Sequence, residues 1–214
     1  MDFIEMRSDT LTLPTDEMRE AMRYAEVGDD VYGEDPTVRR LEELAAAKVG
    51  KEAAMFVPSG TMGNLLAVMT HCRRGDEILL ESECHIYYYE VGGLCAVAGA
   101  VPRLVKGANG VLDPGDVEAA IREENIHYAP AACLAIENTH NRGGGTVTPI
   151  QTMAELRRVA DAHGLGVHLD GARIFNASLA LGVDASEIAK HVDSVMFCLS
   201  KGLSAPVGSI LAGN

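Results

Sequence analysis

Short apolar runs alternate with helix-like segments along the whole chain, and this alternation constrains the fold more than any other feature. The runs expected as strands are 53–57, 77–80, 103–105, 132–137, 167–169, 194–198 and 207–211. Runs that are apolar throughout are typical of strands covered on both faces, as in parallel sheets. The pattern predicts an α/β fold with a mostly parallel sheet between helices.

Capping signals mark the ends of the helices expected between these strands. Thr15 can cap a helix through Met22, and Asp113-Pro114 combines a cap with a proline at the first helical position. Gly50 is expected to end a helix at 37–49. Further helices are expected at 61–73, 88–97 and 150–163.

Composition narrows the class of protein without assigning a function. The 214 residues, 47% of them hydrophobic, can form one sizeable domain with a hydrophobic core. The net charge of −13 would repel a polyanion, so nucleic acid is not an expected partner. No apolar run reaches the ~18 residues of a membrane span, and the start MDFIEMRSDT does not resemble a signal peptide. We therefore expect a cytoplasmic protein with no membrane partner.

The five cysteines predict neither a disulfide framework nor a metal site. Their number is odd, and no two have the C-x-x-C spacing typical of zinc ligands. Several lie in apolar segments, where a free thiol behaves as a small hydrophobic side chain.

Polar residues follow several of the expected strands, and ligands of such sheets bind beyond the carboxyl ends of the strands. The segment 59–64, SGTMGN, joins strand 53–57 to the next helix. Glycine allows close approach of the backbone, and the free amides of a helix start attract an anion. Gly60 and Thr61 are therefore candidate phosphate ligands. The alternative is an ordinary turn followed by a helix cap.

Asp170 follows the expected strand 167–169. A buried acid there needs a cationic or hydrogen-bonding partner, because an unpaired buried charge is costly. The protonated pyridine nitrogen of pyridoxal phosphate (PLP) is one such partner, and the pair makes PLP a better electron sink. Alternatively, Asp170 caps the next helix or pairs with Arg173.

Lys201 follows strand 194–198, and His85 follows strand 77–80. A lysine near a desolvated site can lose its proton and attack a carbonyl, although a lone lysine at a strand end more often extends to water. His85 could stack on an aromatic cofactor or act as a base near neutral pH; the alternative is a structural histidine. Together, a phosphate site, a stacking ring, an acid and a lysine at one sheet edge are what PLP needs.

Six stretches resemble the low-specificity L-threonine aldolases, which are fold-type I PLP enzymes in the wider β-eliminating lyase group. The stretches are RSDT (7–10), GDDVYGEDPTV (28–38), FVPSGTMGN (56–64), IENTHNRGGG (136–145), VHLDGARIFNAS (167–178) and SVMFCLSKGLSAPVGS (194–209). The resemblance covers essentially the whole chain. It implies a three-layer α/β/α large domain that binds PLP at 15–214, preceded by an arm at 1–14 that lines the active site.

The resemblance also implies a role for individual residues at the cofactor. Lys201 would hold PLP through a Schiff base, Asp170 would pair with the pyridine nitrogen, and His85 would stack on the ring. Gly60 and Thr61 would hold the phosphate. The sequence therefore predicts a cofactor site assembled from four separate segments.

On the substrate side, Arg173 would contact the phenolic oxygen of the cofactor or the substrate carboxylate, and Ser8 would help to bind that carboxylate. The loop around Tyr32 would line the site. The family is typically tetrameric, with active sites between subunits, so we expect a homo-oligomer.

The implied reaction is retro-aldol cleavage of a β-hydroxy-α-amino acid, L-threonine or L-allo-threonine, to glycine and acetaldehyde. Catalysis would rest on Lys201, Asp170 and His85, with His85 as the expected base, directly or through water. A PLP-dependent β-elimination from another amino acid is one alternative. A non-catalytic protein that keeps the fold is another.

The sequence stops at Gly213-Asn214, whereas family members continue into a smaller C-terminal domain. That domain normally supplies an arginine for the substrate carboxylate. We therefore expect the C-terminal small domain to be missing from this chain, and its activity to be weakened or lost, because a bidentate carboxylate clamp both binds and orients.

Overall fold

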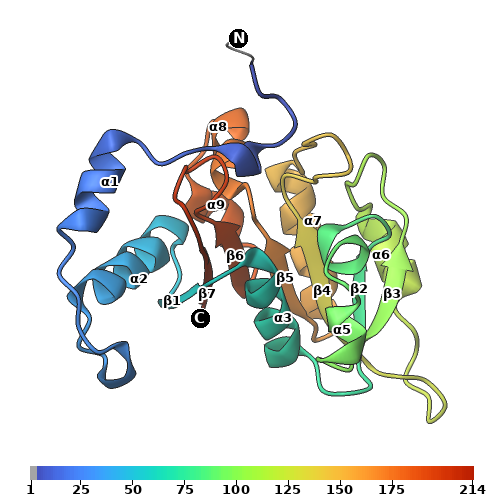
Figure 1. Cartoon of the computed structure of the whole chain (residues 1–214). Helices are drawn as coiled ribbons and strands as arrows, with labels where there is room; N and C mark the ends of the chain where they lie inside the picture. Colours follow the sequence, from blue (N-terminus) through green and yellow to red (C-terminus); the bar gives the residue numbers. More distant parts are fainter. Residues whose placement is uncertain (1–3) are drawn as a thin grey trace.

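The computed structural model describes residues 4–214 and has three layers, with a sheet between two layers of helices (Figure 1). The strands are β1 (Ala53–Val57), β2 (Glu77–Glu81), β3 (Val101–Val105), β4 (Ala131–Glu137), β5 (Gly166–Asp170), β6 (Ser194–Cys198) and β7 (Ser209–Gly213). Their order in the sheet is β1-β7-β6-β5-β4-β2-β3. Strands β6, β5, β4, β2 and β3 pair in parallel, whereas β7 runs antiparallel to both of its neighbours. The expected α/β fold with a mostly parallel sheet is confirmed.

The helices cover both faces of the sheet. They are α1 (Asp16–Arg23), α2 (Pro36–Val49), α3 (Gly60–His71), α4 (His85–Tyr88), α5 (Gly93–Ala96), α6 (Pro114–Ala120), α7 (Ile150–Ala162), α8 (Ile174–Leu181) and α9 (Ala185–Ala189). Two short 3-10 helices, η1 (Asp9–Leu11) and η2 (Asp30–Tyr32), lie near the amino terminus. Helices α3, α4 and α5 pack on one face, and α2, α6, α7, α8 and α9 pack on the other.

Successive residues of the central strands point into two separate hydrophobic cores. In β4, Leu134 and Ile136 join the core beneath α2, α6, α7, α8 and α9, whereas Cys133 and Ala135 join the core beneath α3, α4 and α5. All four side chains are buried. This two-sided burial explains why the strands are apolar throughout, since side chains alternate between the faces of a strand.

Local capping follows the expected residues. The Thr15 hydroxyl accepts a hydrogen bond from the amide of Met18 at the start of α1. Asp113 caps α6 ahead of a proline at its first turn, and Gly50 ends α2 in the left-handed conformation, with φ of 64°. Each contact satisfies a backbone group that the helix itself leaves free.

Two expected elements differ from those observed. The helix expected at 88–97 is instead two one-turn helices, α4 and α5, separated by Gly92 with φ of 69°. Glycine reaches this conformation without steric cost and interrupts a helix there. The last strand lies at Ser209–Gly213 rather than 207–211, because Gly208 has φ of 100° and turns the chain just before it.

The amino-terminal arm lies against the segment after β6. Residues 1–3 of the arm expected at 1–14 lie outside the described residues. The hydroxyl of Thr12 donates to the carbonyl of Lys201 at 2.7 Å. Asp9 pairs with Arg173 through two hydrogen bonds of 2.6 and 2.8 Å. These contacts join the arm to two segments that carry expected site residues.

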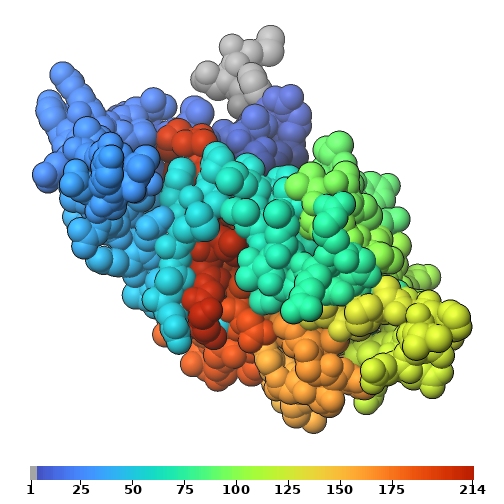
Figure 2. Space-filling model, turned by 90° about the horizontal axis from the view of Figure 1, so that it is seen from below, coloured from blue at the N-terminus to red at the C-terminus, as the bar shows by residue number. Residues whose placement is uncertain are grey.

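A cavity opens on the opposite side of the molecule from the arm. In the view from below, the red carboxyl-terminal residues lie in it beside cyan segments of the chain (Figure 2). This cavity of about 350 Å³ is lined by residues that include Met55, His71, Ser194, Leu211 and Asn214.

Candidate active site

Five of the expected site residues meet at the carboxyl ends of the parallel strands, around a cavity of about 340 Å³. Its lining includes Gly60, Thr61, His85, Asp170 and Lys201. These residues come from the start of α3, the start of α4, the end of β5 and the segment after β6. The sheet therefore brings together segments that are far apart in the sequence.

Two glycines let the first turn of α3 lie directly against β6. A Cβ atom at Gly60 would lie 3.2 Å from the Sγ of Cys198, and a Cβ at Gly63 would lie 2.7 Å from the Cγ of Met196. The Ser59 hydroxyl accepts from the amide of Met62. Because the first amides of a helix have no partner within it, Gly60 and Thr61 keep free donors at the cavity. The cap and the anion site, which were alternatives in the sequence, are compatible.

Asp170 is the last residue of β5 and is 2% exposed. One carboxylate oxygen accepts from the Nδ2 of Asn64 at 2.9 Å, and the other accepts from the amide of Ala172 at 3.1 Å. No lysine or arginine in the described part of the chain forms an ion pair with it. A buried carboxylate with neutral donors alone is costly, so the site favours a cationic ligand beside Asp170.

Lys201 follows β6, the strand that neighbours β5 in the sheet. Its side chain lines the cavity, and its carbonyl accepts from the hydroxyl of Thr12 and from the amide of Ser204. The backbone that carries the amine is therefore held from both the arm and the following turn.

His85 begins α4 and pairs with Glu90, a buried residue that the sequence analysis missed. The Nδ1 of His85 and a carboxylate oxygen of Glu90 are 2.9 Å apart. This hydrogen bond raises the pKa of His85 above its ordinary value. Burial raises the pKa of Glu90 even though the same bond opposes it. With Nδ1 occupied, the Nε2 of His85 is the ring nitrogen left for a ligand.

Polar atoms of His85, Glu90 and Asp170 all lie within 4.8 Å of one another. Such a set could hold a metal ion. However, Nδ1 of His85 already pairs with Glu90, and Asn64 donates to both Glu90 and Asp170 at 2.8 and 2.9 Å. Hydrogen bonds between protein groups therefore account for the cluster.

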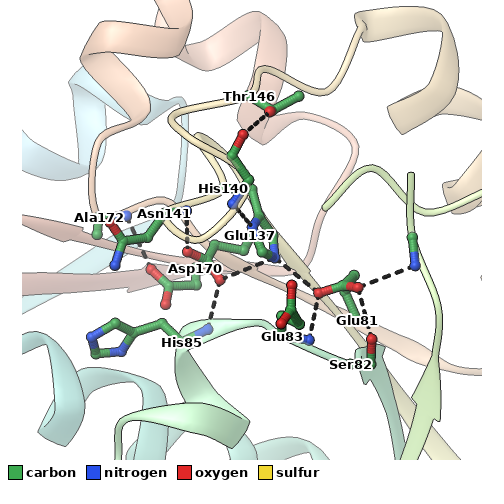
Figure 3. A network of polar contacts seen from close by, with 12 residues as sticks. Glu81, Ser82, Glu83, His85, Glu137, His140, Asn141, Thr146, Asp170 and Ala172 are labelled. Atoms are coloured by element: carbon green, nitrogen blue, oxygen red, sulfur yellow. Dashed lines mark hydrogen bonds and ion pairs between the residues drawn. The ribbon is translucent and has the colours of Figure 1, made fainter. Parts of the chain in front are cut away.

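A second polar network fixes the backbone of His85 (Figure 3). Glu137, at the end of β4, accepts from the amide of His85 at 2.6 Å and from the amide of Asn141 at 2.8 Å. His140 pairs with Glu81 at 3.0 Å and lies 3.7 Å from Glu137. Burial raises the pKa of Glu137, and the charge of Asp170 adds to that effect. The network joins the ends of β2 and β4 to the start of α4.

Arg173 and Ser8, the residues expected to bind the substrate carboxylate, are not among the residues that line this cavity. Arg173 is held by Asp9, and their hydrogen bond raises the pKa of the guanidinium and lowers that of the carboxyl. The Ser8 hydroxyl caps η1 by accepting from the amide of Thr10. The alternative in which Asp170 pairs with Arg173 is not what the structure has, because the partner of Arg173 is Asp9.

Sequence reasoning missed Asn64 and Glu90 because asparagine and glutamate are usually exposed. Asn64 lies in the stretch FVPSGTMGN but carried no assigned role, and Glu90 follows three tyrosines. An available signal is helical spacing, since Asn64 lies four residues after Gly60 and thus on the same face of α3.

The sheet order and the lysine and carboxylate at one edge define the large-domain fold of fold-type I PLP-dependent enzymes. The chain belongs to the β-eliminating lyase family, whose model matches residues 5–214. A crystal structure of a putative L-allo-threonine aldolase from Listeria monocytogenes superposes with a TM-score of 0.80 at 28% identity, covering 92% of this chain and 54% of that one.

Curated relatives extend the comparison to sequence. The chain is 50% identical to low-specificity L-threonine aldolase 1 of Arabidopsis thaliana and 45% identical to low specificity L-threonine aldolase of Escherichia coli K12. These matches cover 100% and 99% of this chain but 61% and 63% of the relatives. The chain thus spans about three fifths of their length. Within the described residues, no helix has both the length and the apolar character of a membrane span.

Proposed function

We propose that this chain binds PLP and forms the catalytic part of an enzyme that cleaves L-threonine or L-allo-threonine to glycine and acetaldehyde. The observation that carries the proposal is that Lys201, Asp170, His85 and the start of α3 line one cavity. The names of the similar proteins from Arabidopsis thaliana and Escherichia coli support the choice of reaction.

The residues at the cavity fit the cofactor. Within residues 4–214, no lysine or arginine forms an ion pair with Asp170, and a protonated pyridine nitrogen would provide a cationic partner. The amides of Gly60 and Thr61 at the start of α3 suit a phosphate. His85 offers a ring to stack on the cofactor, and Lys201 offers an amine to bind its aldehyde. When bound, PLP supplies the electron sink for breaking the Cα–Cβ bond.

The protein would contribute positioning and charge. Lys201 would hold the cofactor until the substrate amine takes its place. Asp170 would keep the pyridine nitrogen protonated, because a nearby negative charge favours the protonated form. The hydrogen bonds from Asn64 and Ala172 leave the Asp170 carboxylate little freedom to turn, and a fixed dipole or charge is more effective than a mobile one.

His85 would take the proton of the substrate β-hydroxyl. Its pairing with Glu90 resembles the way a carboxylate fixes the tautomer of an imidazole base, because a proton on Nδ1 leaves Nε2 as the acceptor. When the imidazole of His85 stacks on the cofactor, the lone pair of Nε2 lies in the plane of the imidazole and does not point directly at the substrate hydroxyl. A water molecule between Nε2 and the hydroxyl would connect the two, so His85 would act directly or through water.

Ser8 and Arg173 would bind the substrate carboxylate. Arg173 is paired with Asp9 in this structure, so it would exchange this partner for the substrate. The planar guanidinium can bind a carboxylate with two parallel hydrogen bonds. A lysine at this position would lose that geometry.

The amino-terminal region supports a homo-oligomer, proposed as a tetramer. Residues 4–32 carry strongly exposed apolar side chains, which include Ile4, Met6, Val27, Val31 and Tyr32 at 77–89% exposure. Concentrated apolar exposure is typical of an interaction surface. Light scattering coupled to size-exclusion chromatography tests the assembly; a monomer at micromolar concentration would contradict it.

A second candidate is PLP-dependent β-elimination, which the description of the matching family model favours. One experiment separates the two reactions. The protein is incubated with PLP and L-threonine or L-allo-threonine, and glycine, acetaldehyde, the keto acid and ammonia are quantified. Glycine and acetaldehyde in equal amounts support the proposed aldol cleavage, whereas a keto acid and ammonia support elimination. A keto acid and ammonia without glycine would contradict the proposed cleavage.

A further inference from the structure

A continuous chain of hydrogen bonds runs from Asp170 through the interior to the cavity on the opposite side of the molecule from the arm, which His71 and Ser194 line. Asn64 donates to Asp170 at 2.9 Å, and its other amide atom is 3.0 Å from the Nε2 of His168. The Nδ1 of His168 is 2.9 Å from the hydroxyl of Ser194, which is 2.7 Å from the Nε2 of His71. We call Asn64, His168, Ser194 and His71 the relay. It leads from Asn64 in α3 to His168 in β5 and Ser194 in β6, and it returns to α3 at His71.

The carboxylates at one end fix the direction of every hydrogen bond in the relay. The NH₂ group of Asn64 must face Asp170 and Glu90, because carboxylates only accept. Its carbonyl oxygen therefore faces His168, so the Nε2 of His168 must carry a proton. A neutral His168 then has a bare Nδ1, which accepts from the hydroxyl of Ser194. The oxygen of Ser194 in turn accepts from the Nε2 of His71.

Because the relay is buried, each of its polar groups needs a hydrogen-bond partner within the protein. Asn64 and His168 have no exposed surface. Burial lowers the pKa of His168 to about 3, so its ring is neutral across the physiological range. A neutral ring has one donor and one acceptor, and the relay uses both. Nothing else in the described structure donates to the Asp170 oxygen that Asn64 holds.

We propose that Asn64, His168 and Ser194 are positioning residues that hold the Asp170 carboxylate in place to keep the cofactor's pyridine nitrogen protonated. This inference rests on the proposed PLP function, because it assigns the relay a role at that cofactor. A buried polar chain satisfied at every member is rigid, and breaking it anywhere leaves a buried group without a partner. Asn64 would otherwise be free to present its carbonyl to Asp170.

The direction of the relay can be tested without cofactor. In protein labelled with ¹⁵N-histidine, the His168 resonances distinguish protonated from bare ring nitrogens. The proposal expects a proton on Nε2 and none on Nδ1 across the neutral pH range. A proton on Nδ1 with a bare Nε2 would overturn it, because Asn64 would then have to turn its carbonyl away from His168 and toward the carboxylates.

The role at the cofactor is tested with PLP labelled with ¹⁵N at the pyridine nitrogen. His168→Leu removes the donor to Asn64, whereas His168→Gln keeps an NH₂ donor group and a carbonyl acceptor. We expect His168→Leu to bind PLP roughly tenfold more weakly, from the worth of one hydrogen bond that serves a charged group. We also expect the pyridine nitrogen of PLP bound to His168→Leu to lose its proton at a lower pH than in the unaltered protein. In His168→Gln, the affinity for PLP and the pH of proton loss should recover in part.

His163→Gln is the matched control, because this exposed histidine follows α7 and does not line the cavity. It should bind PLP as the unaltered protein does. Equal PLP affinity and equal pyridine titration in His168→Leu and the unaltered protein would overturn the positioning role. If the unaltered protein binds no PLP, the proposed function fails instead, and the histidine tautomer still decides whether the relay has the stated direction.

Discussion

The side chains of Lys201 and Asp170 line one cavity, although Asp170 ends β5 and Lys201 follows β6, with α8 and α9 between these strands in the sequence. The two strands, β5 and β6, are parallel neighbours, so their carboxyl ends meet at the same sheet edge. An amine and a carboxylate at that edge can bind opposite ends of one heteroaromatic ring. This relationship supports the PLP proposal.

Replacing Asp170 with Asn should lower the rate of substrate cleavage by at least about 100-fold, the scale of one lost preorganised electrostatic contact. The substitution should also lower the pKa of Glu90, because burial raises that pKa and the charge of Asp170 adds to the effect. Product assays and carboxyl-carbon NMR titration measure the two effects. An unchanged rate would show that Asp170 does not serve the reaction.

The pairing of His85 with Glu90 predicts how stability depends on pH. The raised pKa of His85 means that its stabilising contribution is complete below its unfolded value of about 6.5 and is lost as pH rises through the folded value. Glu90→Gln removes the main cause of the shift. Urea unfolding between about pH 6 and about pH 9 should therefore show a smaller loss of stability in Glu90→Gln.

The matched control is Glu123→Gln, at an exposed position, which should retain the pH dependence of the unaltered protein. NMR titration of the His85 ring should also give a lower pKa in Glu90→Gln. If the pKa of His85 is the same with and without the Glu90 carboxylate, the hydrogen bond does not have the assigned effect.

His140 should matter for stability rather than for the chemical step. It is 1% exposed and pairs with Glu81, and its Nδ1 accepts from the amide of Gly143 at 3.0 Å. His140→Leu removes the partner of a buried carboxylate and should lower the free energy of unfolding by about 3 kcal/mol. Urea denaturation measures this change. A loss below about 0.5 kcal/mol, the range of ordinary surface substitutions, would contradict the role given to the network.

The arm should depend on its two contacts with the rest of the site. Thr12→Val removes the hydroxyl that donates to Lys201, and Asp9→Asn weakens the pair with Arg173. The double variant should show faster amide hydrogen exchange in residues 4–14 and a higher KM for the amino acid. Thr37→Val, which alters a hydroxyl that donates to Glu26 far from this contact, is the control. Unchanged exchange in the arm would mean that other contacts hold it.

Much of the fold could be predicted because its signals are local. Thr15, Asp113 and Gly50 act on backbone groups within one turn, so their effects are visible in the sequence. The direction of β7 was not visible, because an apolar run carries no information on whether its neighbours are parallel. The prediction of one helix at 88–97 was wrong because Gly92 has a positive φ, which a count of apolar residues cannot detect.

The candidate site likewise contains residues that the sequence could predict and residues that it could not. Gly60, Asp170 and Lys201 stand at the ends of strands or starts of helices, where topology alone places them at one edge. Glu90 and Asn64 could not be assigned, because their burial depends on how α3 packs against α5 and the sheet. Glutamate and asparagine are usually exposed, so their sequence context favoured the wrong environment. The partner of Arg173 depended equally on the path of the arm.

The most direct test of the central claim is reduction of the protein with borohydride after PLP addition, followed by peptide mass spectrometry. Borohydride converts a carbon–nitrogen double bond between a lysine and PLP into a stable amine. We expect a pyridoxyl phosphate group on Lys201, its loss in Lys201→Ala and its retention in Lys48→Ala, which alters an exposed lysine in α2. A label on another lysine, or no label on Lys201 at saturating PLP, would contradict it.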